Sequence, residues 1–210
     1  MRLEHAARPD SAMARLRSNA VTARILFVAM AVVAWTGAGA DPAPVPAGSG
    51  ADTVVIVVRH AEKVLPADAA ASTMADENPP LTPAGERRAA AIAEALADAG
   101  IAAVYSTPYR RTMQTAAPLA ARAGVAVTSY DSHLDPSEFA RQVTAAHRGA
   151  TVLVVGHSNT VPGLVAAFAG KPIEGMDDSV YGRVYLISIA ADGKARLLRM
   201  GFPPYATDAE

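Results

Sequence analysis

A run of five consecutive apolar residues, Val54 to Val58, is the feature that most constrains the fold of this chain. The run does not alternate between apolar and polar positions, so a strand formed by it must be buried on both faces. Strands of that kind occur in parallel sheets that are covered by helices on both sides. The run leads directly into Arg59 and His60, which must either reach solvent or bind a ligand where the strand ends.

The rest of the chain alternates between strand and helix patterns. Strands are predicted over 53–58, 102–105, 125–128, 151–155, 183–189 and 195–199. Helices are predicted over 82–99, 109–123, 136–147 and 159–169. Asp192-Gly193, between the last two strands, indicates a hairpin turn. This order predicts an α/β fold, a three-layer α/β/α sandwich whose central sheet is mostly parallel with an antiparallel edge.

Composition narrows the class of protein further. Just over half of the 210 residues are apolar and only 5% are aromatic, so we expect one domain with a core of Val, Leu, Ile and Ala. Cysteine is absent, which excludes disulfides, thiolate metal sites and a cysteine nucleophile. The formal net charge of −1 gives no reason to expect a nucleic-acid partner.

The N-terminal part has the pattern of a targeting segment. Arg15, Arg17 and Arg24 precede an apolar run from Ile25 to Trp35, and the small residues Ala38-Gly39-Ala40 follow it. The apolar run is about half the length of the roughly 20 residues that a membrane span needs. We therefore expect residues 1–40 to be a secretory signal peptide that is cut after Ala40, with an uncleaved N-terminal anchor as the alternative.

The remaining segments follow from that division. Residues 41–50 have the composition of a flexible linker, and residues 51–210 form the expected catalytic domain. Residues 64–80 fit neither a helix nor a strand period, so we expect a long loop of the kind that often covers a site. The expected location is the periplasm or the medium, with no membrane association after cleavage.

Polar residues follow three of the predicted strands. Arg59-His60 ends the first strand, Arg110-Arg111 follows the second, and His157-Ser158-Asn159 follows the strand over 151–155. Because ligands of such sheets bind beyond the carboxyl ends of the strands, we expect these groups to share one rim. Arg matches the geometry of phosphate oxygens, and neutral imidazole is a good nucleophile near pH 7. The pattern therefore favours phosphoryl transfer, with nearby guanidiniums lowering the pKa of the histidine.

Each of these positions also has a purely structural interpretation. A histidine after a buried strand is often a core residue, and Arg111 alone is typical of a solvated helix. No metal or other cofactor is expected, because the histidines lack Asp or Glu partners at ligand spacing and the arginines neutralise the phosphate charge. His133 and His147 follow no strand, so we expect both at the surface.

The segments "VVIVVRHAEK", "LTPAGERRA", "YSTPYRRTMQTA" and "VVGHSNT" together resemble the histidine phosphatase superfamily, in its phosphoglycerate mutase-like branch. The resemblance covers about residues 53–200. Ala61 stands where the family signature has glycine. The family's pocket arginine matches Arg111, three residues before Gln114-Thr115, and the second family histidine matches His157.

The resemblance implies specific roles in a reaction on a small phosphorylated substrate. His60 would attack phosphorus and become phosphohistidine. Arg59, Arg111 and His157 would hold the phosphoryl oxygens and stabilise their charge. Ser158 is a further expected phosphate ligand, although it could instead cap the following helix, and Asn159 has the same two interpretations.

A proton donor for the leaving oxygen is the uncertain part. The family pattern suggests a carboxylate in the region "SYDSHLDPSEF", and Asp135 is the preferred candidate. Asp131, Glu138 and Glu62 remain open, and Glu62 is also expected at the substrate-facing rim. Asp135 precedes a proline, so a helix N-cap explains it equally well.

Three other functions compete with a phosphatase. "GHSNT" resembles the nucleophile elbow of serine hydrolases, but no histidine follows Ser158 in the chain, as that fold requires. A phosphate-binding module without turnover and a phosphoglycerate mutase-type phosphotransferase remain as alternatives. The expected function is an exported, metal-independent phosphatase that hydrolyses phosphomonoesters or phosphoramidates through His60.

Overall fold

The fold is that of a computed structural model, which describes residues 50–65 and 78–202. The expected signal peptide, nearly all of the linker and most of the 64–80 loop lie outside the described residues. Within the described ranges, no helix combines the length and the apolar character needed to cross a membrane.

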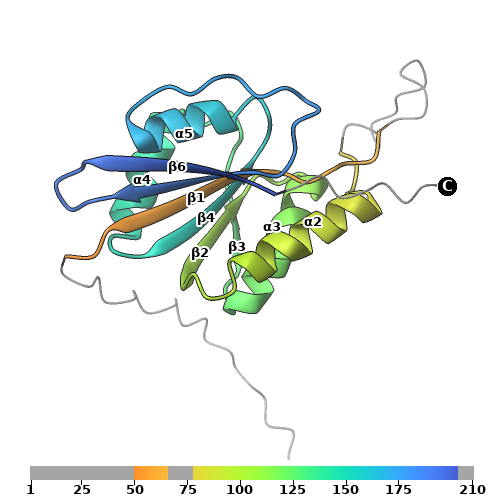
Figure 1. The fold of residues 1–210 in the computed structure, drawn as a ribbon, viewed down its shortest axis with the longest axis horizontal. Coiled ribbons are helices and arrows are strands. Elements are labelled where there is room, and N and C mark those ends of the chain that lie inside the picture. Colours follow the sequence, from red (N-terminus) through yellow and green to blue (C-terminus); the bar gives the residue numbers. More distant parts are fainter. Residues whose placement is uncertain (1–49, 66–77, 203–210) are drawn as a thin grey trace, which may run out of the picture. The chain divides into compact units, whose positions relative to one another are not determined.

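The central sheet has the strand order β3-β2-β4-β1-β5-β6 (Figure 1). Strand β1 is paired in parallel with β4, β4 with β2 and β2 with β3, whereas β5 is antiparallel to both β1 and β6. The predicted sheet, mostly parallel with an antiparallel edge, is confirmed. The strand bounds are β1 Thr53–Arg59, β2 Ile101–Ser106, β3 Val127–Ser129, β4 Thr151–Gly156, β5 Arg183–Ile189 and β6 Ala195–Gly201.

Helices cover both faces of this sheet (Figure 1). Apolar side chains of α2 and α3 pack on one face, and those of α4 and α5 pack on the other. The three-layer architecture predicted from the sequence is therefore confirmed. The helix bounds are α2 Pro83–Ala95, α3 Arg110–Ala123, α4 Pro136–Ala146 and α5 Val161–Ala169.

Two helix ends differ from the sequence prediction for local reasons. Helix α2 begins as expected, with Thr82 Oγ1 accepting a hydrogen bond from Gly85 N at 3.1 Å, but it ends at Ala95. The next turn tightens, since Ala97 N bonds to the carbonyl of Glu94 instead of one residue further back. Helix α5 starts two residues late, because the chain first turns around the carbonyl of His157.

Strand β1 is buried on both faces, as the apolar run predicts. Val55 and Val57 belong to the core beneath α4 and α5, whereas Ile56 and Val58 belong to the core beneath α2 and α3. All four are 1% exposed or less. The strand is consequently packed from both sides, and its last residue, Arg59, lies at its carboxyl end between β4 and β5.

Candidate active site

A cavity of about 390 Å³ lies beyond the carboxyl ends of β1 and β4 and the start of α3. It brings together six of the residues that the sequence singles out, from three separate segments. They are Arg59 and His60, Arg111, and His157, Ser158 and Asn159. The expectation that these strand ends share one rim therefore agrees with the structure.

His60 is held in a tautomer that suits a nucleophile. Its Nδ1 lies 2.7 Å from the carbonyl oxygen of Ala61, and only a protonated nitrogen can donate to that acceptor. The other nitrogen, Nε2, therefore keeps its lone pair. Burial is the largest cause that lowers the pKa of His60 to about 3; the bond to Ala61 opposes it and the charge of Arg59 adds to it. The imidazole is thus neutral at physiological pH.

The backbone turn after His60 is fixed by the start of α3. Thr115 Oγ1 accepts a hydrogen bond from Ala61 N at 3.0 Å and donates to the carbonyl of Arg111 at 2.7 Å. The side chain of Gln114 accepts from Leu81 N at 2.8 Å. The Gln-Thr pair therefore links the turn that carries His60 to the helix turn that carries Arg111.

His157 lies beside His60, with the two ring centroids 5.4 Å apart. Its Nε2 is 2.8 Å from Thr107 Oγ1, and its Nδ1 is 3.4 Å from Arg111 Nη2. Because a guanidinium can only donate, Nδ1 acts as the acceptor and Nε2 carries the proton. Burial first, and then the charges of Arg111 and Arg59, lower the pKa of His157 to about 4.

Arg59 connects the end of β1 to the loop between α5 and β5. Its Nη1 lies within 3.1 Å of the carbonyl oxygens of Asp177, Asp178 and Val180. Its guanidinium stacks 4.1 Å above the ring of Tyr181. Its Nε is buried and has no hydrogen-bond partner among the described residues. An oxyanion in the cavity would satisfy such a donor.

The cavity is strongly cationic. Arg59, Lys63 and Arg111 line it, against a single carboxylate, Asp178, among the described lining residues. The guanidinium of Arg111 lies 4.5 Å above the ring of Tyr109, which fixes its direction. Arg110, by contrast, is exposed and does not line the cavity, in agreement with the choice of Arg111 over its neighbour. This balance of charge suits a small, doubly negative group.

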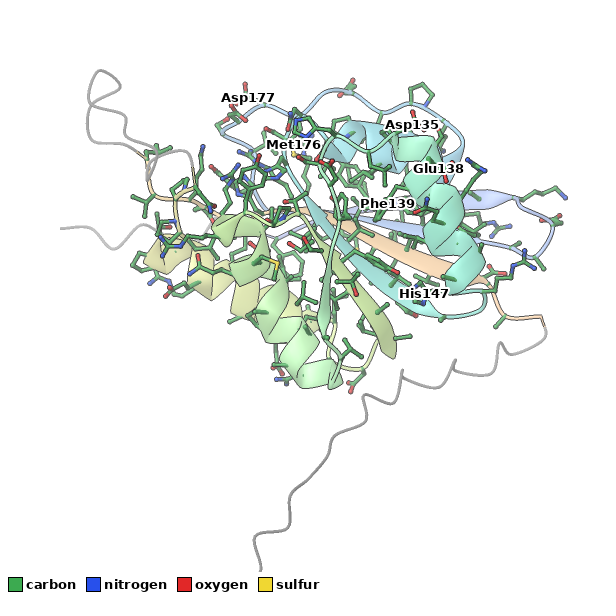
Figure 2. The ribbon with its side chains drawn as sticks, turned by 180° about the vertical axis from the view of Figure 1, so that it is seen from behind. Asp135, Glu138, Phe139, His147, Met176 and Asp177 are labelled. Atoms are coloured by element: carbon green, nitrogen blue, oxygen red, sulfur yellow. The ribbon has the colours of Figure 1, made fainter. Side chains whose placement is uncertain are left out.

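The structure does not bring the preferred proton donor, Asp135, into this cavity. Its carboxylate caps α4, accepting hydrogen bonds from Ser137 N at 3.0 Å and Glu138 N at 2.9 Å. Figure 2 shows Asp135 at the N-terminal end of α4 with Glu138 one turn along. Glu138 pairs with Arg141 on the surface of the same helix. The N-cap interpretation of Asp135 therefore describes its position in this structure.

Glu62 and Asp131 are also absent from the cavity lining. Both oxygens of Glu62 accept from Arg88 Nε at 2.9 Å, and the side chain of Arg88 is only 2% exposed. Glu62 thus points toward α2 and does not line the cavity. Asp131 accepts from the backbone and from the ring of His133.

Six residues that line the cavity are given no role in the sequence analysis above. They are Lys63, Tyr109, Ser132, His133, Thr160 and Asp178. Lys63 and Tyr109 lie within recognised motifs, so those motifs could have suggested them. Asp178 lies in a segment without strand or helix pattern, and no sequence signal marks it. His133, expected at the surface, is indeed exposed but faces this cavity.

Gly85 sets how closely α2 approaches the turn that carries His60. A β-carbon at this position would overlap the carbonyl oxygen of Glu62. We expect Gly85→Ala to lower the free energy of unfolding by about 1–3 kcal/mol, because helix or turn must move. Urea denaturation would measure this. Gly175→Ala is the matched control, since nothing lies within 4 Å of a β-carbon there. Equal stability of the two variants would contradict the close approach.

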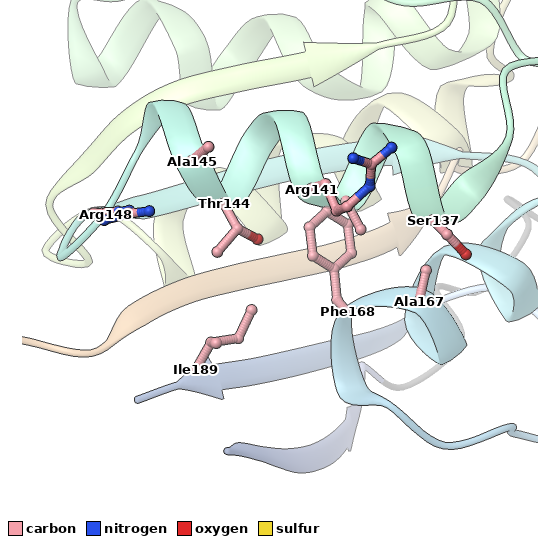
Figure 3. A pocket seen from close by; sticks show the side chains of 9 residues that line it. Ser137, Arg141, Thr144, Ala145, Arg148, Ala167, Phe168 and Ile189 are labelled. Carbon is pink, nitrogen blue, oxygen red and sulfur yellow. The ribbon is translucent and has the colours of Figure 1, made fainter. Parts of the chain in front are cut away.

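A second cavity of similar size, about 380 Å³, lies between α4, α5 and β5 (Figure 3). Its lining includes Phe168, Ile189 and several alanines, with Arg141 and Arg148 as its charged groups. It contains no imidazole, so it offers no nucleophile of the kind found beside β1. Within residues 50–65 and 78–202, no group of three or more His, Asp or Glu side chains could hold a metal ion.

Comparison with known sequences finds one family. Residues 55–134 match the histidine phosphatase superfamily, branch 1. The uncharacterized protein Rv0525 of Mycobacterium tuberculosis is 38% identical over 88 residues, which are 42% of this chain and 43% of that protein. The match thus spans less than half the length of this relative.

Comparison with solved structures finds the same fold. SixA from Nakamurella multipartitia is 25% identical, with a TM-score of 0.51 over 74% of this chain and 98% of that chain. The protein histidine phosphatase SixA, solved with tungstate, is 18% identical, with a TM-score of 0.54 over 70% of this chain and 96% of its own. Mycobacterial glucosyl-3-phosphoglycerate phosphatase Rv2419c is 15% identical, with a TM-score of 0.55 over 70% and 97%. The resemblance of this chain to the histidine phosphatase superfamily, branch 1, is therefore confirmed by both its sequence and its fold.

Proposed function

We propose that this protein is a metal-independent phosphatase that hydrolyses phosphomonoesters or phosphoramidates through a phosphohistidine on His60. The observation that carries the proposal is the tautomer of His60 and its place in the cavity. Its Nδ1 donates to the carbonyl of Ala61, so the lone pair of Nε2 is available inside a cavity lined by Arg59, Arg111 and His157. Cationic donors around a neutral nucleophile favour attack on a phosphoryl group, because they stabilise the charge that the transition state carries.

The substrate is small and phosphorylated, and its class is open within that limit. Related folds include proteins named as phosphohistidine and glucosyl-3-phosphoglycerate phosphatases. These names support both phosphoramidates and phosphate esters as candidates. Ser158 lines the cavity, and its hydroxyl donates a hydrogen bond to Asp178 at 2.5 Å.

A phosphate-binding module without turnover is the second candidate. It is favoured by one observation, the absence of Asp135, Asp131, Glu138 and Glu62 from the cavity lining. Such a module would retain the cationic cavity and bind phosphate, yet it would form no covalent intermediate.

Trapping of the intermediate tests the proposal. We expect p-nitrophenyl phosphate carrying labelled phosphorus to leave label on His60 after rapid denaturation at alkaline pH, where a phosphoramidate survives. The reaction contains EDTA, which should not reduce turnover, because side-chain cations neutralise the phosphate. Peptide mapping locates the label. Stoichiometric phosphate binding without label or turnover would support the binding module instead.

Export is also part of the proposal, on the strength of residues 1–40. The arginines, the apolar run from Ile25 to Trp35 and the small residues before Asp41 support a cleaved signal peptide and a periplasmic or secreted product. The intact mass of the mature chain would test cleavage after Ala40.

A further inference from the structure

His133 lines the same cavity as His60, from the loop between β3 and α4. In the sheet order, β2 and β4 separate β3 from β1, so this loop approaches the cavity from the side opposite to the end of β1. Phosphoryl transfer places the attacking and the leaving oxygen or nitrogen roughly in line, on opposite sides of phosphorus. His133 would therefore face the leaving group if the phosphoryl group lies between the end of β1 and this loop.

His133 also borders a second, smaller pocket of about 230 Å³. Together with Ser132, Asn159 and Thr160, it lines both hollows. The rest of the smaller pocket is mostly apolar or aromatic, with Tyr130, Leu134, Phe139 and Leu164 among its walls. Apart from His133, the described residues lining it carry no charge. The phosphate cavity thus continues, past His133, into a space suited to an uncharged organic group.

Asp131 fixes the orientation of the His133 ring. Its Oδ1 lies 2.9 Å from His133 N and 3.1 Å from His133 Nδ1. Since an ionised carboxylate can only accept, Nδ1 carries a proton and Nε2 is the nitrogen that can exchange a proton with a ligand. This is the arrangement of an acid–base histidine held by a carboxylate.

The other acidic group in the cavity is poorly suited to donate a proton. Asp178 accepts from Ser158 Oγ at 2.5 Å and lies 3.5 Å from Arg59 Nη2. The bond from Ser158 and then the charge of Arg59 lower the pKa of Asp178 below its ordinary value of 3.8. It is therefore ionised at neutral pH and acts as a ligand of Arg59 and Ser158.

We propose that His133 is the general acid of this phosphatase and that Asp131 is its positioning residue, an inference that rests on the proposed function. As His60 Nε2 bonds to phosphorus, the bond from phosphorus to the leaving oxygen breaks and its electron pair stays on that oxygen. The oxygen takes the proton from Nε2 of the His133 imidazolium, which releases the alcohol. Neutral His133 then accepts a proton from the water that attacks phosphohistidine, which frees phosphate and restores both side chains.

Two aryl phosphates of similar size test this role through kcat/KM, which includes no step after phosphoryl transfer. Phenol, with a pKa of about 10 as in tyrosine, needs protonation as it leaves; p-nitrophenol is far more acidic and does not. We expect His133→Gln to lower kcat/KM for phenyl phosphate by about 10²-fold or more, and for p-nitrophenyl phosphate by less than about tenfold. Asp131→Asn should show the same selectivity with a smaller loss, which a purely structural defect would not produce.

His147→Gln is the matched control, because His147 lies at the far end of α4 bonded to Tyr105 and does not line the cavity (Figure 2). It should leave both rates unchanged. Equal losses on the two substrates with His133→Gln, or no loss, would overturn the assignment while wild-type turnover and label on His60 uphold the phosphatase. A selective loss with Asp178→Asn and none with His133→Gln would move the acid to Asp178. Wild-type protein without turnover or label would refute the phosphatase and this inference together.

Discussion

Replacement of His60 by alanine is expected to lower kcat for p-nitrophenyl phosphate by on the order of 10⁴-fold or more. The reason is that Nε2 of this ring is the nitrogen with a free lone pair, held so by the bond from Nδ1 to the carbonyl of Ala61. The adjacent His157 cannot replace it, since its Nε2 carries the proton that faces Thr107. Steady-state kinetics with the purified variant would measure the loss.

Oxyanion binding should survive the same substitution. Arg59, Arg111 and His157 remain in His60→Ala, so titration with tungstate, a tetrahedral oxyanion, should still show binding. Unfolding by urea checks that the buried site has not collapsed, because His60 is only 3% exposed. Turnover within about tenfold of the wild type, in a variant that folds normally, would place the nucleophile elsewhere.

Most of the fold could be read from the sequence, because its strands are defined by burial. The apolar run ending at Val58 has to lie between two helical layers, and the strand over 183–189 has the predicted bounds. The ends of the helices were predicted less accurately, because hydrogen bonds of single residues decide where a helix begins and ends. The carbonyl of His157, for example, delays the start of α5.

The residues proposed to bind phosphate could also be predicted from the sequence. Its groups follow directly after strands or begin a helix, so the direction of the parallel strands carries them to one edge. Arg111 could be told from Arg110 because the family resemblance places the pocket arginine three residues before Gln114-Thr115, and of the two only Arg111 lines the cavity. Thr115 and Gln114, on the following turn, fix the backbone near His60.

The proposed general acid, His133, could not be predicted in this way. Residues 130–135 form a turn without period, and the direction of each side chain depends on local hydrogen bonds. The carboxylate of Asp135 accepts a hydrogen bond from the first turn of α4, and that of Asp131 accepts one from the ring of His133. The family pattern favoured a carboxylate in this region, whereas the residue of this turn that lines the cavity with a titratable side chain is His133.

Glu62 is another acid candidate whose side chain is held by a local partner. It lies two residues after His60 in the sequence, yet it pairs with Arg88 and does not line the cavity. Its carboxylate and the guanidinium of Arg88 form an ion pair in which Arg88 Nη2 lies 2.5 Å from Oε1, and the two side chains are 21% and 2% exposed. The pair joins α2 to the turn after His60. We expect Glu62→Gln to lower the free energy of unfolding by about 3 kcal/mol, because the buried guanidinium of Arg88 then loses the charge of Glu62.

Glu94→Gln is the matched control for this effect. Glu94 and Arg122 form an ion pair of the same type, with Arg122 Nη2 also 2.5 Å from the carboxylate, but their side chains are 72% and 47% exposed. Solvent screens such a pair, so we expect a change below about 1 kcal/mol. Urea denaturation of both variants at neutral pH gives the comparison. Similar small losses in the two would show that burial does not strengthen the pair at Glu62.

The pH dependence of the difference between wild type and Glu62→Gln identifies the charge as the cause. Burial tends to raise the pKa of Glu62, but the hydrogen bonds and charge of Arg88 outweigh it and hold the pKa below its ordinary value of 4.5. The stabilising contribution of a carboxylate with a lowered pKa is present above the unfolded pKa and is lost as pH falls through the folded one. We therefore expect the stability difference to be constant above about pH 5 and to shrink as the pH falls below 4.5. A difference that stays constant into strong acid would mean that the glutamine disturbs packing, and that the ion pair itself contributes little to holding α2 against the turn that carries His60.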